Sequence, residues 1–431
     1  MFVSVVNKRG NMNDVICAQS TSQPIPVTFI GRISRYFTQD ILYLFMFYFG
    51  ISPIVFSFNR HAVLFMFVYT SILFLLYKKK IGVELLIVSC YWILVNTLAF
   101  SNSTTYFEQL PEAAYTVLMV IWMAYMIISI LGKTMFIKFE SLFYWLSLIS
   151  LPLFVLENVY RPIFLRMNPV FRAITGDEMF RAGGWYGGFY TFNAWAHRRN
   201  SGFMWEPGGF AFILIFAMII RLSMNGFRID KHIFVYFICL ATTLSTAGFV
   251  VASMIVIIIL FQRSKHLYPI LMIPIVIYLF INIVWELDFM GGKIETYFRS
   301  IDRTWQRSTA LRVNRFGIFY YAWIESFNNP LGYGAFPVKG FYEQFGSSIS
   351  GPNTLAYVLV EWGWLGLIAY SYAIKKAIRT FFQNVNITLV VMLSICIWLM
   401  LFSNPRNYNI FVLSFLFLPF IDRNRTFISR L

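Results

Sequence analysis

The chain has 431 residues, of which 58% are hydrophobic, 20% aromatic and only 13% charged, with a mean hydropathy of +0.65. A typical soluble domain carries about 25% charged residues, so this composition excludes an ordinary soluble enzyme. It predicts an all-α polytopic membrane protein whose formal net charge of +16 must be distributed between loops and tails.

Residues 1–40 are polar and contain no apolar core followed by a small-residue cleavage site. We therefore expect a cytoplasmic N-terminal lead without a signal peptide. Residues 41–421 are expected to form a single transmembrane domain, and 422–431 a cytoplasmic tail. Apolar runs of suitable length predict about twelve transmembrane helices, near 41–58, 62–77, 81–100, 110–131, 139–157, 207–222, 232–246, 247–261, 267–284, 353–374, 385–403 and 408–421.

The run 232–261 is long enough for one helix, but Leu244-Ser245-Thr246-Ala247-Gly248 in its middle favours two spans and a tight turn. Sixteen Lys and Arg residues then fall on one side of the membrane in short loops and the tail, against only Arg60 and Arg406 in the opposite short loops. The positive-inside rule places both termini in the cytoplasm.

Two long loops, about 158–206 and 285–352, are then extracytoplasmic and are expected to contain interfacial helices. Arginine predominates over lysine among their basic residues, which include Arg161, Arg166, Arg172, Arg181, Arg198, Arg199, Lys293, Arg299, Arg303, Arg307, Arg312, Arg315 and Lys339. Because a guanidinium binds phosphate oxygens bidentately, this pattern predicts a phosphorylated, membrane-embedded ligand. Pairing with the loops' own acids or with lipid head groups is the alternative.

In the second loop, Glu295, Arg299, Arg303 and Arg307 recur every four residues and would share one face of a helix. That face could bind a ligand or simply be solvated. Arg312 and Arg315 begin the aromatic segment 311–327, which is typical of a helix lying in the membrane interface. These two arginines are candidates for contact with a ligand at head-group level.

The first loop contains Arg181-Ala-Gly-Gly-Trp185-Tyr186-Gly-Gly-Phe-Tyr190. Glycine lets a ligand approach the backbone closely, and Trp185 and Tyr186 could stack on sugar faces. The alternative is an aromatic belt at the membrane surface, where Trp and Tyr are enriched.

The loop ends in Arg198-Arg199-Asn-Ser-Gly-Phe-Met-Trp-Glu206-Pro207-Gly-Gly-Phe210, immediately before an apolar run. Charge and irregular backbone are costly next to lipid, so this segment is the leading candidate site. Glu206 either interacts with the dipole of the following helix or acts as a general base or an arginine-orienting group. Glu361, inside the predicted span 353–374, is interpreted as part of a buried hydrogen-bond network.

The external loops contain no Asp-x-Asp pair, the chain shows no His/Cys metal spacing, and there is no phosphate-binding-loop signature. We therefore expect no cofactor, no metal and no nucleic-acid partner. The four cysteines, Cys17, Cys90, Cys239 and Cys396, offer no external pair, so no disulfide framework is expected.

Four segments in residues 196–404 together resemble the O-antigen polymerase and O-antigen ligase superfamily of bacterial membrane glycosyltransferases. The first is Arg199-Asn-Ser-Gly-Phe-Met-Trp-Glu206-Pro-Gly208, similar to Arg-x-Ser-Gly-Phe-x-x-Glu-Pro-Gly. The others are the Ser/Thr turn 244–248, the stretch Asn329-Pro-Leu-Gly-Tyr-Gly334, and Asn353-Thr354 followed by Glu361-Trp-Gly-Trp-Leu-Gly366.

The resemblance implies metal-independent, inverting transfer of a glycan from undecaprenyl diphosphate on the external face of the bacterial inner membrane. A polymerase moves the chain onto a lipid-linked acceptor repeat unit, and a chain-length regulator and a flippase are its implied partners beside the lipid bilayer. The family's Arg-to-Gly spacing of eleven residues fits Arg198 with Gly209 and Arg172 with Gly183. Arg199, Glu206 and Arg315 become the catalytic candidates, and Arg198, Arg172, Arg299, Arg303, Arg307, Arg312, Trp185, Tyr186 and Asn353 the substrate-binding ones.

Two positions depart from the family pattern. Pro352 precedes Asn353 where many ligases have His, and Ala247 and Gly248 follow the Ser/Thr turn where many relatives have Arg. The missing histidine favours a polymerase of O-antigen, capsule or exopolysaccharide over a ligase that transfers glycan to lipid A–core, which stays the alternative. A flippase for lipid-linked oligosaccharide is a third hypothesis, but such carriers usually show internal repeats, and none is evident.

Overall fold

The computed structural model describes residues 39–44, 46–47, 60–101, 110–175, 184–193, 198–263, 315–334, 353–382, 385–404 and 409–428. Residues 1–44 and 45–431 form two separate compact units, and every element named below belongs to the second. The longer helices are α3 (Arg60–Leu76), α4 (Val83–Ser101), α6 (Leu110–Leu131), α7 (Thr134–Val159), α10 (Pro207–Asn225), α11 (Lys231–Thr243), α12 (Thr246–Arg263), α15 (Arg315–Asn328), α17 (Thr354–Phe381), α18 (Ile387–Phe402) and α19 (Ile410–Ile428).

The described part of the chain is mostly helical, as predicted. Among its helices, α7, α10 and α17 are long and apolar enough to cross a membrane, and further apolar helices are shorter. Ten predicted spans coincide with described helices, and 110–131 matches α6 at both ends. The predicted spans 41–58 and 267–284 lie largely or wholly outside the described residues.

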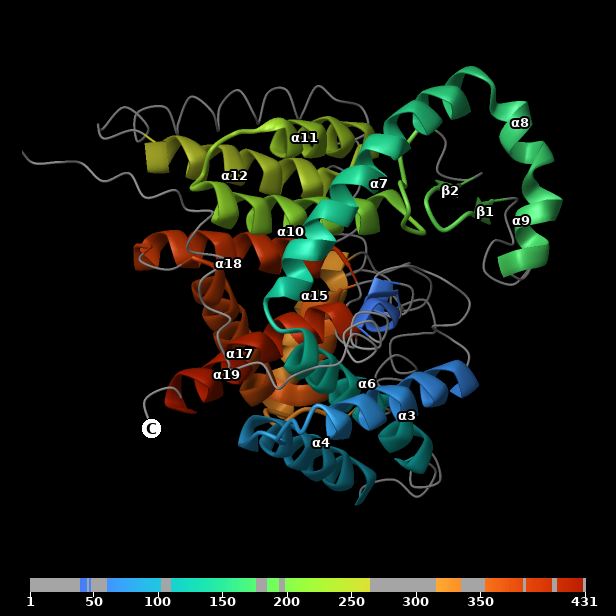
Figure 1. Cartoon of the computed structure of the whole chain (residues 1–431). Coiled ribbons are helices and arrows are strands. Elements are labelled where there is room, and N and C mark those ends of the chain that lie inside the picture. The colour runs from blue at the N-terminus through green and yellow to red at the C-terminus, as the bar shows by residue number, and fades with distance from the viewer. Residues whose placement is uncertain are drawn as a thin grey trace, which may run out of the picture. The chain divides into compact units, whose positions relative to one another are not determined.

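The interpretation of 232–261 as two helices is confirmed. Helix α11 ends at Thr243, its C-cap Leu244 adopts left-handed backbone angles (φ 47°, ψ 40°), and α12 begins at Thr246. Figure 1 shows α10, α11 and α12 running side by side. The tight turn at Leu244 thus brings α12 back alongside α11.

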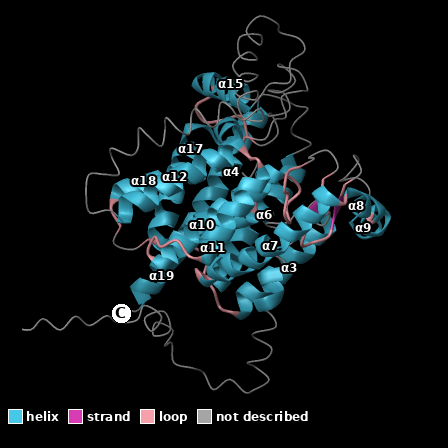
Figure 2. Ribbon diagram, turned by 90° about the horizontal axis from the view of Figure 1, so that it is seen from above, coloured by secondary structure: helices cyan, strands magenta, loops and turns pink. Residues whose placement is uncertain are grey.

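Between α7 and α10 the chain forms α8 (Arg161–Arg166), α9 (Asn168–Thr175) and an antiparallel hairpin of β1 (Trp185–Tyr186) and β2 (Thr191–Phe192). Both strands lie beside α8 and α9 (Figure 2). The buried rings of Phe164, Trp185, Tyr190 and Phe192 form a small separate core for this loop. At its edge, the Tyr190 hydroxyl donates to Glu157 Oε2 at 2.5 Å, which ties the hairpin to the end of α7.

Helix α17 is kinked at Gly363, whose backbone (φ 62°, ψ −164°) is not helical. The kink leaves two carbonyls without helical partners, and both accept from the loop after α15: Tyr333 N–H donates to Val360 O at 2.7 Å and Gly334 N–H to Glu361 O at 3.1 Å. In return, Trp364 N–H donates to Pro330 O at 2.9 Å. Non-helical backbone at membrane depth is tolerated where protein satisfies it, and this loop supplies those bonds.

An ion-pair network joins α7, α10 and α11 at the opposite end of these helices from the Leu244 turn. The buried Glu140 of α7 lies 2.8 Å from His232 Nδ1 and accepts from the Tyr236 hydroxyl at 2.9 Å. Arg221 NH2 lies 2.6 Å from Asp230 Oδ2, and Asp230 also caps α11 by accepting from Ile233 N–H. Partial burial raises the pKa of Asp230, but the hydrogen bonds from Arg221 and Ile233 outweigh it and leave that pKa below its ordinary value.

Asp230→Asn should lower the free energy of unfolding at pH 7 by roughly 1 kcal/mol, and with it the melting temperature of the purified protein. Asparagine can still cap α11, but it cannot form the ion pair with Arg221. A carboxyl whose pKa is lowered by folding stabilises the protein above its unfolded pKa. The difference in melting temperature between wild type and variant should therefore persist at pH 6 and disappear as the pH falls through the lowered pKa of Asp230. Thermal unfolding across pH measures this, and an unchanged gap at low pH would contradict the ion-pair explanation.

Gly363→Ala should destabilise the protein far more than Gly226→Ala. Both glycines have positive φ, which costs a Cβ-bearing residue roughly 1–2 kcal/mol. A Cβ on Gly226 would meet no atom within 4 Å, whereas one on Gly363 would lie 2.2 Å from Pro330 O. Melting temperatures of the two variants in the same detergent provide the comparison, and equal losses would show that the kink does not depend on this close approach.

Candidate functional site

The segment before α10 is folded back over the start of that helix. Asn200 is buried and donates through Nδ2 to Thr242 Oγ1 at 3.0 Å, while its Oδ1 accepts from Gly202 N–H at 2.8 Å. Gly202 has φ 53°, and its Cα lies against the ring of Phe210, so a Cβ there would clash at 2.6 Å. Close packing on Phe210 therefore explains why glycine is required in the Ser-Gly-Phe sequence.

Arg199 is held against the end of α11. Its Nε donates to Thr243 O at 3.1 Å and its NH2 to Leu244 O at 3.2 Å. A cation is favoured at a helix C-terminus, where carbonyls lack helical partners. Arg199 thus links the segment 199–208 to the Ser/Thr turn at 244–248. Arg198, its neighbour, is exposed and has a left-handed φ of 61°.

Glu206 is the N-terminal boundary residue of α10, and Pro207 is its first helical residue. The Glu206 side chain makes no capping hydrogen bond, so its carboxylate is not used to satisfy the helix end. It lies instead beside Gly208: the position of a Cβ on Gly208 would be 3.6 Å from Glu206 Oε1 and 3.7 Å from Asn404 Oδ1. The carboxylate and the Asn404 amide therefore flank the same glycine.

Asn404 connects this point to the start of α17. Its backbone carbonyl accepts from Thr354 N–H at 3.2 Å and from the Thr354 hydroxyl. Asn353 caps α17 by accepting from Ala356 N–H at 3.1 Å. We refer to Arg199, Glu206, Asn353, Thr354 and Asn404 as the polar end of the bundle.

The helices α10, α12 and α17 begin at the polar end. Gly248 in the first turn of α12 packs on Ala211 of α10, with a Cβ-to-Cβ separation that would be 3.1 Å. The starts of α10 and α17 meet through Gly208, Asn404 and Thr354, as described above. Helix N-termini present unpaired N–H groups and a partial positive charge. Their convergence with an arginine makes the polar end suited to binding an anion.

The polar end and its surroundings also contain buried acceptor atoms without donors. Among the described residues, no group donates to Asn193 Oδ1 or Asn404 Oδ1, and Thr246 Oγ1 has no hydrogen-bond partner. Asn193 is tied into the segment before α10 through Nδ2, which donates to Ser201 Oγ at 3.0 Å. A buried acceptor left without a donor costs about 1–3 kcal/mol, so an ordered water that donates to these atoms would be favoured here.

The start of α15 lies at the same end of the bundle. Phe319, one turn into α15, contacts Phe402 at the end of α18 with 5.6 Å between ring centroids, and Trp323 contacts Trp364 of α17 at 4.8 Å. Within the predicted segment 311–327, a helix is observed from Arg315 onward as α15, and residues 311–314 lie outside the described residues. The backbone places Arg315 one turn from Phe319, and its side chain lies outside the described residues.

Trp185 and Tyr186 are both buried. Trp185 stacks on Phe171 at 4.2 Å and donates from Nε1 to Phe164 O, and the Tyr186 hydroxyl donates to Gly188 O at 3.3 Å. Arg172 belongs to α9, and its side chain lies outside the described residues. Residues 299, 303, 307 and 312 also lie outside them.

Sequence reasoning missed Asn404 and Asn193. Asn404 stands between Ser403 and Pro405, directly after an apolar run, and a polar residue at such a boundary is the signal that could have indicated it. Glu361 was assigned a buried network role; it is 6% exposed, and its carbonyl accepts from Gly334 N–H.

Comparisons with protein-family models, with curated proteins and with solved structures find no match to this chain.

Proposed function

We propose that the chain is a membrane glycosyltransferase that polymerises polysaccharide repeat units carried on undecaprenyl diphosphate. The observation that carries the proposal is that each of the four resembling segments contacts another of them directly or through Asn404. Arg199 donates to Leu244 O, Glu206 and Asn404 flank Gly208 while Asn404 O accepts from Thr354, and the 329–334 loop bonds to the kink at Gly363. These contacts support the interpretation of the four segments as parts of one family pattern.

In this proposal the polar end binds the donor diphosphate. The guanidinium of Arg199 is oriented by two backbone carbonyls, and the N-termini of α10, α12 and α17 add positive partial charge. Such a preorganised site stabilises negative charge that develops on a leaving group. Arg315 would add charge from the start of α15, and Arg198 from the exposed side of the segment.

The reaction breaks the bond between the donor's anomeric carbon and the diphosphate oxygen, which keeps the bonding electrons. A hydroxyl of the acceptor repeat unit attacks that carbon from the opposite face, so the configuration inverts. Glu206 accepts the proton of that hydroxyl.

Arg199→Ala should abolish long-chain product when membranes containing the protein are given lipid-linked repeat units. Because Arg199 also holds the end of α11, the variant should melt earlier, so Arg199→Lys serves as a second variant that keeps the charge but loses the guanidinium fork. Arg228→Ala, an exposed arginine in the α10–α11 loop, is the matched control and should behave as wild type. Wild-type chain lengths from a correctly accumulated Arg199→Ala protein would reject the site.

Glu206→Gln should lower the turnover rate by a factor of about 10²–10⁴, the usual contribution of a general base. The melting temperature should stay unchanged, since the Glu206 side chain makes no capping hydrogen bond. Rates of repeat-unit addition as a function of pH, together with thermal unfolding, provide the test. Full activity in the glutamine variant, with the wild-type pH profile, would assign the proton transfer to another group.

A further inference from the structure

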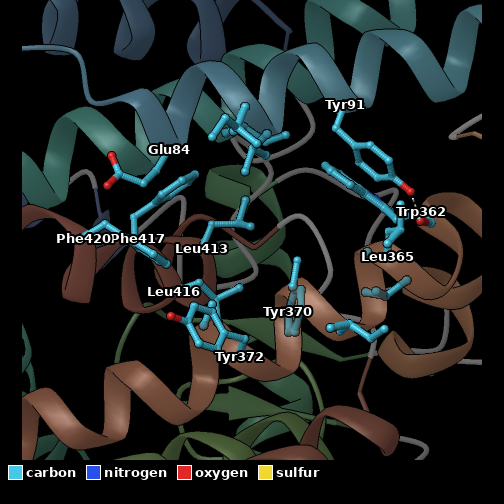
Figure 3. A pocket seen from close by; sticks show the side chains of 18 residues that line it. Glu84, Tyr91, Trp362, Leu365, Tyr370, Tyr372, Leu413, Leu416, Phe417 and Phe420 are labelled. Atoms are coloured by element: carbon cyan, nitrogen blue, oxygen red, sulfur yellow. Dashed lines mark hydrogen bonds between the residues drawn. The ribbon is translucent and has the colours of Figure 1, made fainter.

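A groove with a volume of about 620 Å³ lies between α4, α17 and α19. In Figure 3, Glu84, Phe417 and Phe420 lie towards one end of the groove, and Tyr91, Trp362 and Leu365 towards the other (Figure 3). The Tyr91 hydroxyl closes the second end by donating to Trp362 O at 2.7 Å, beside the kink of α17. Nearly all of the remaining wall is aliphatic or aromatic, so the groove matches a hydrocarbon chain.

One end of the groove is basic. Lys376 Nζ lies 4.4 Å from the centroid of the Tyr372 ring and 5.4 Å from that of Phe420, and both rings line the groove. Lys375 is its neighbour in α17, and Lys78, Lys79 and Lys80 precede α4. The one acid in the wall, Glu84, lies close to Gly82, as does the Tyr125 hydroxyl. The net charge around this end is positive, which favours an anionic head group over a neutral one.

We propose that this groove binds an anionic phospholipid, with an acyl chain along α17 and the phosphate at Lys376. The site is distinct from the polar end, because α17 begins at Asn353 and reaches Lys376 only near its other terminus. The ligand therefore belongs to the opposite leaflet from the proposed substrate, and the inference does not depend on the proposed reaction.

Native mass spectrometry of the full chain, in micelles containing equal amounts of phosphatidylglycerol and phosphatidylcholine, tests the proposal. Wild type should retain phosphatidylglycerol at least tenfold over phosphatidylcholine. Ala369→Trp, which fills the groove, should lose at least tenfold of the bound lipid. Val391→Trp on α18, at a residue 42% exposed and outside the groove wall, should retain it. If Ala369→Trp is not monodisperse, Ile368→Trp at another wall position replaces it.

Lys376→Gln should remove the preference for phosphatidylglycerol, whereas Arg379→Gln, an exposed cation on the same helix, should preserve it. Equal retention of the two lipids by wild type would overturn the proposal, as would unchanged retention in the groove-filling variants. Displacement of the bound lipid by a polyprenyl phosphate but not by phosphatidylglycerol would also overturn it, and would assign the groove to the proposed substrate instead.

Discussion

Backbone N–H and C=O groups placed among apolar helices must find partners within the protein, because lipid offers none. This constraint determines where loops attach in this fold. The break at Gly363 frees carbonyls that the 329–334 loop satisfies, and the end of α11 leaves carbonyls that Arg199 satisfies. Each of these two interruptions of helical hydrogen bonding thus fixes the position of a segment that is distant in sequence.

The same constraint concentrates chemistry at the polar end. Helix starts bring unpaired donors, Arg199 brings a fixed cation, and Asn404 brings a buried acceptor that no described group satisfies. A structural explanation accounts for Arg199 and Asn353, which cap helices. It does not account for the Glu206 carboxylate, which makes no capping hydrogen bond. Glu206 is therefore the residue of the polar end on which the proposed function depends most.

Hydropathy predicted much of the helical framework, since apolar length is a direct consequence of burial in lipid. Two helices continue seven residues beyond the predicted spans: the span predicted over 353–374 continues to Phe381 and the one over 408–421 to Ile428, because the charged residues that end each apolar run remain helical. The polar end was predicted only in part. Sequence indicated Arg199 and Glu206 through charge next to an apolar run, but the bonds from Arg199 to Thr243 and Leu244 depend on tertiary packing that no local pattern encodes.

The aromatic loop shows the other limit. Trp185 and Tyr186 have the composition of a membrane-surface belt or of a sugar-binding surface, and the structure buries both, with Trp185 among phenylalanines. Composition alone does not distinguish a surface belt, a sugar-binding surface and a buried core, because all three use large rings next to glycine. The structure distinguishes them for Trp185 through its contacts with Phe164 of α8 and Phe171 of α9.

The two carbonyls that accept from Arg199 have an evolutionary consequence. Because this arginine completes the end of α11, selection for folding alone would preserve it in descendants of the chain. The Glu206 side chain makes no capping hydrogen bond, so its persistence or loss among descendants would be the more sensitive record of selection on the proposed reaction.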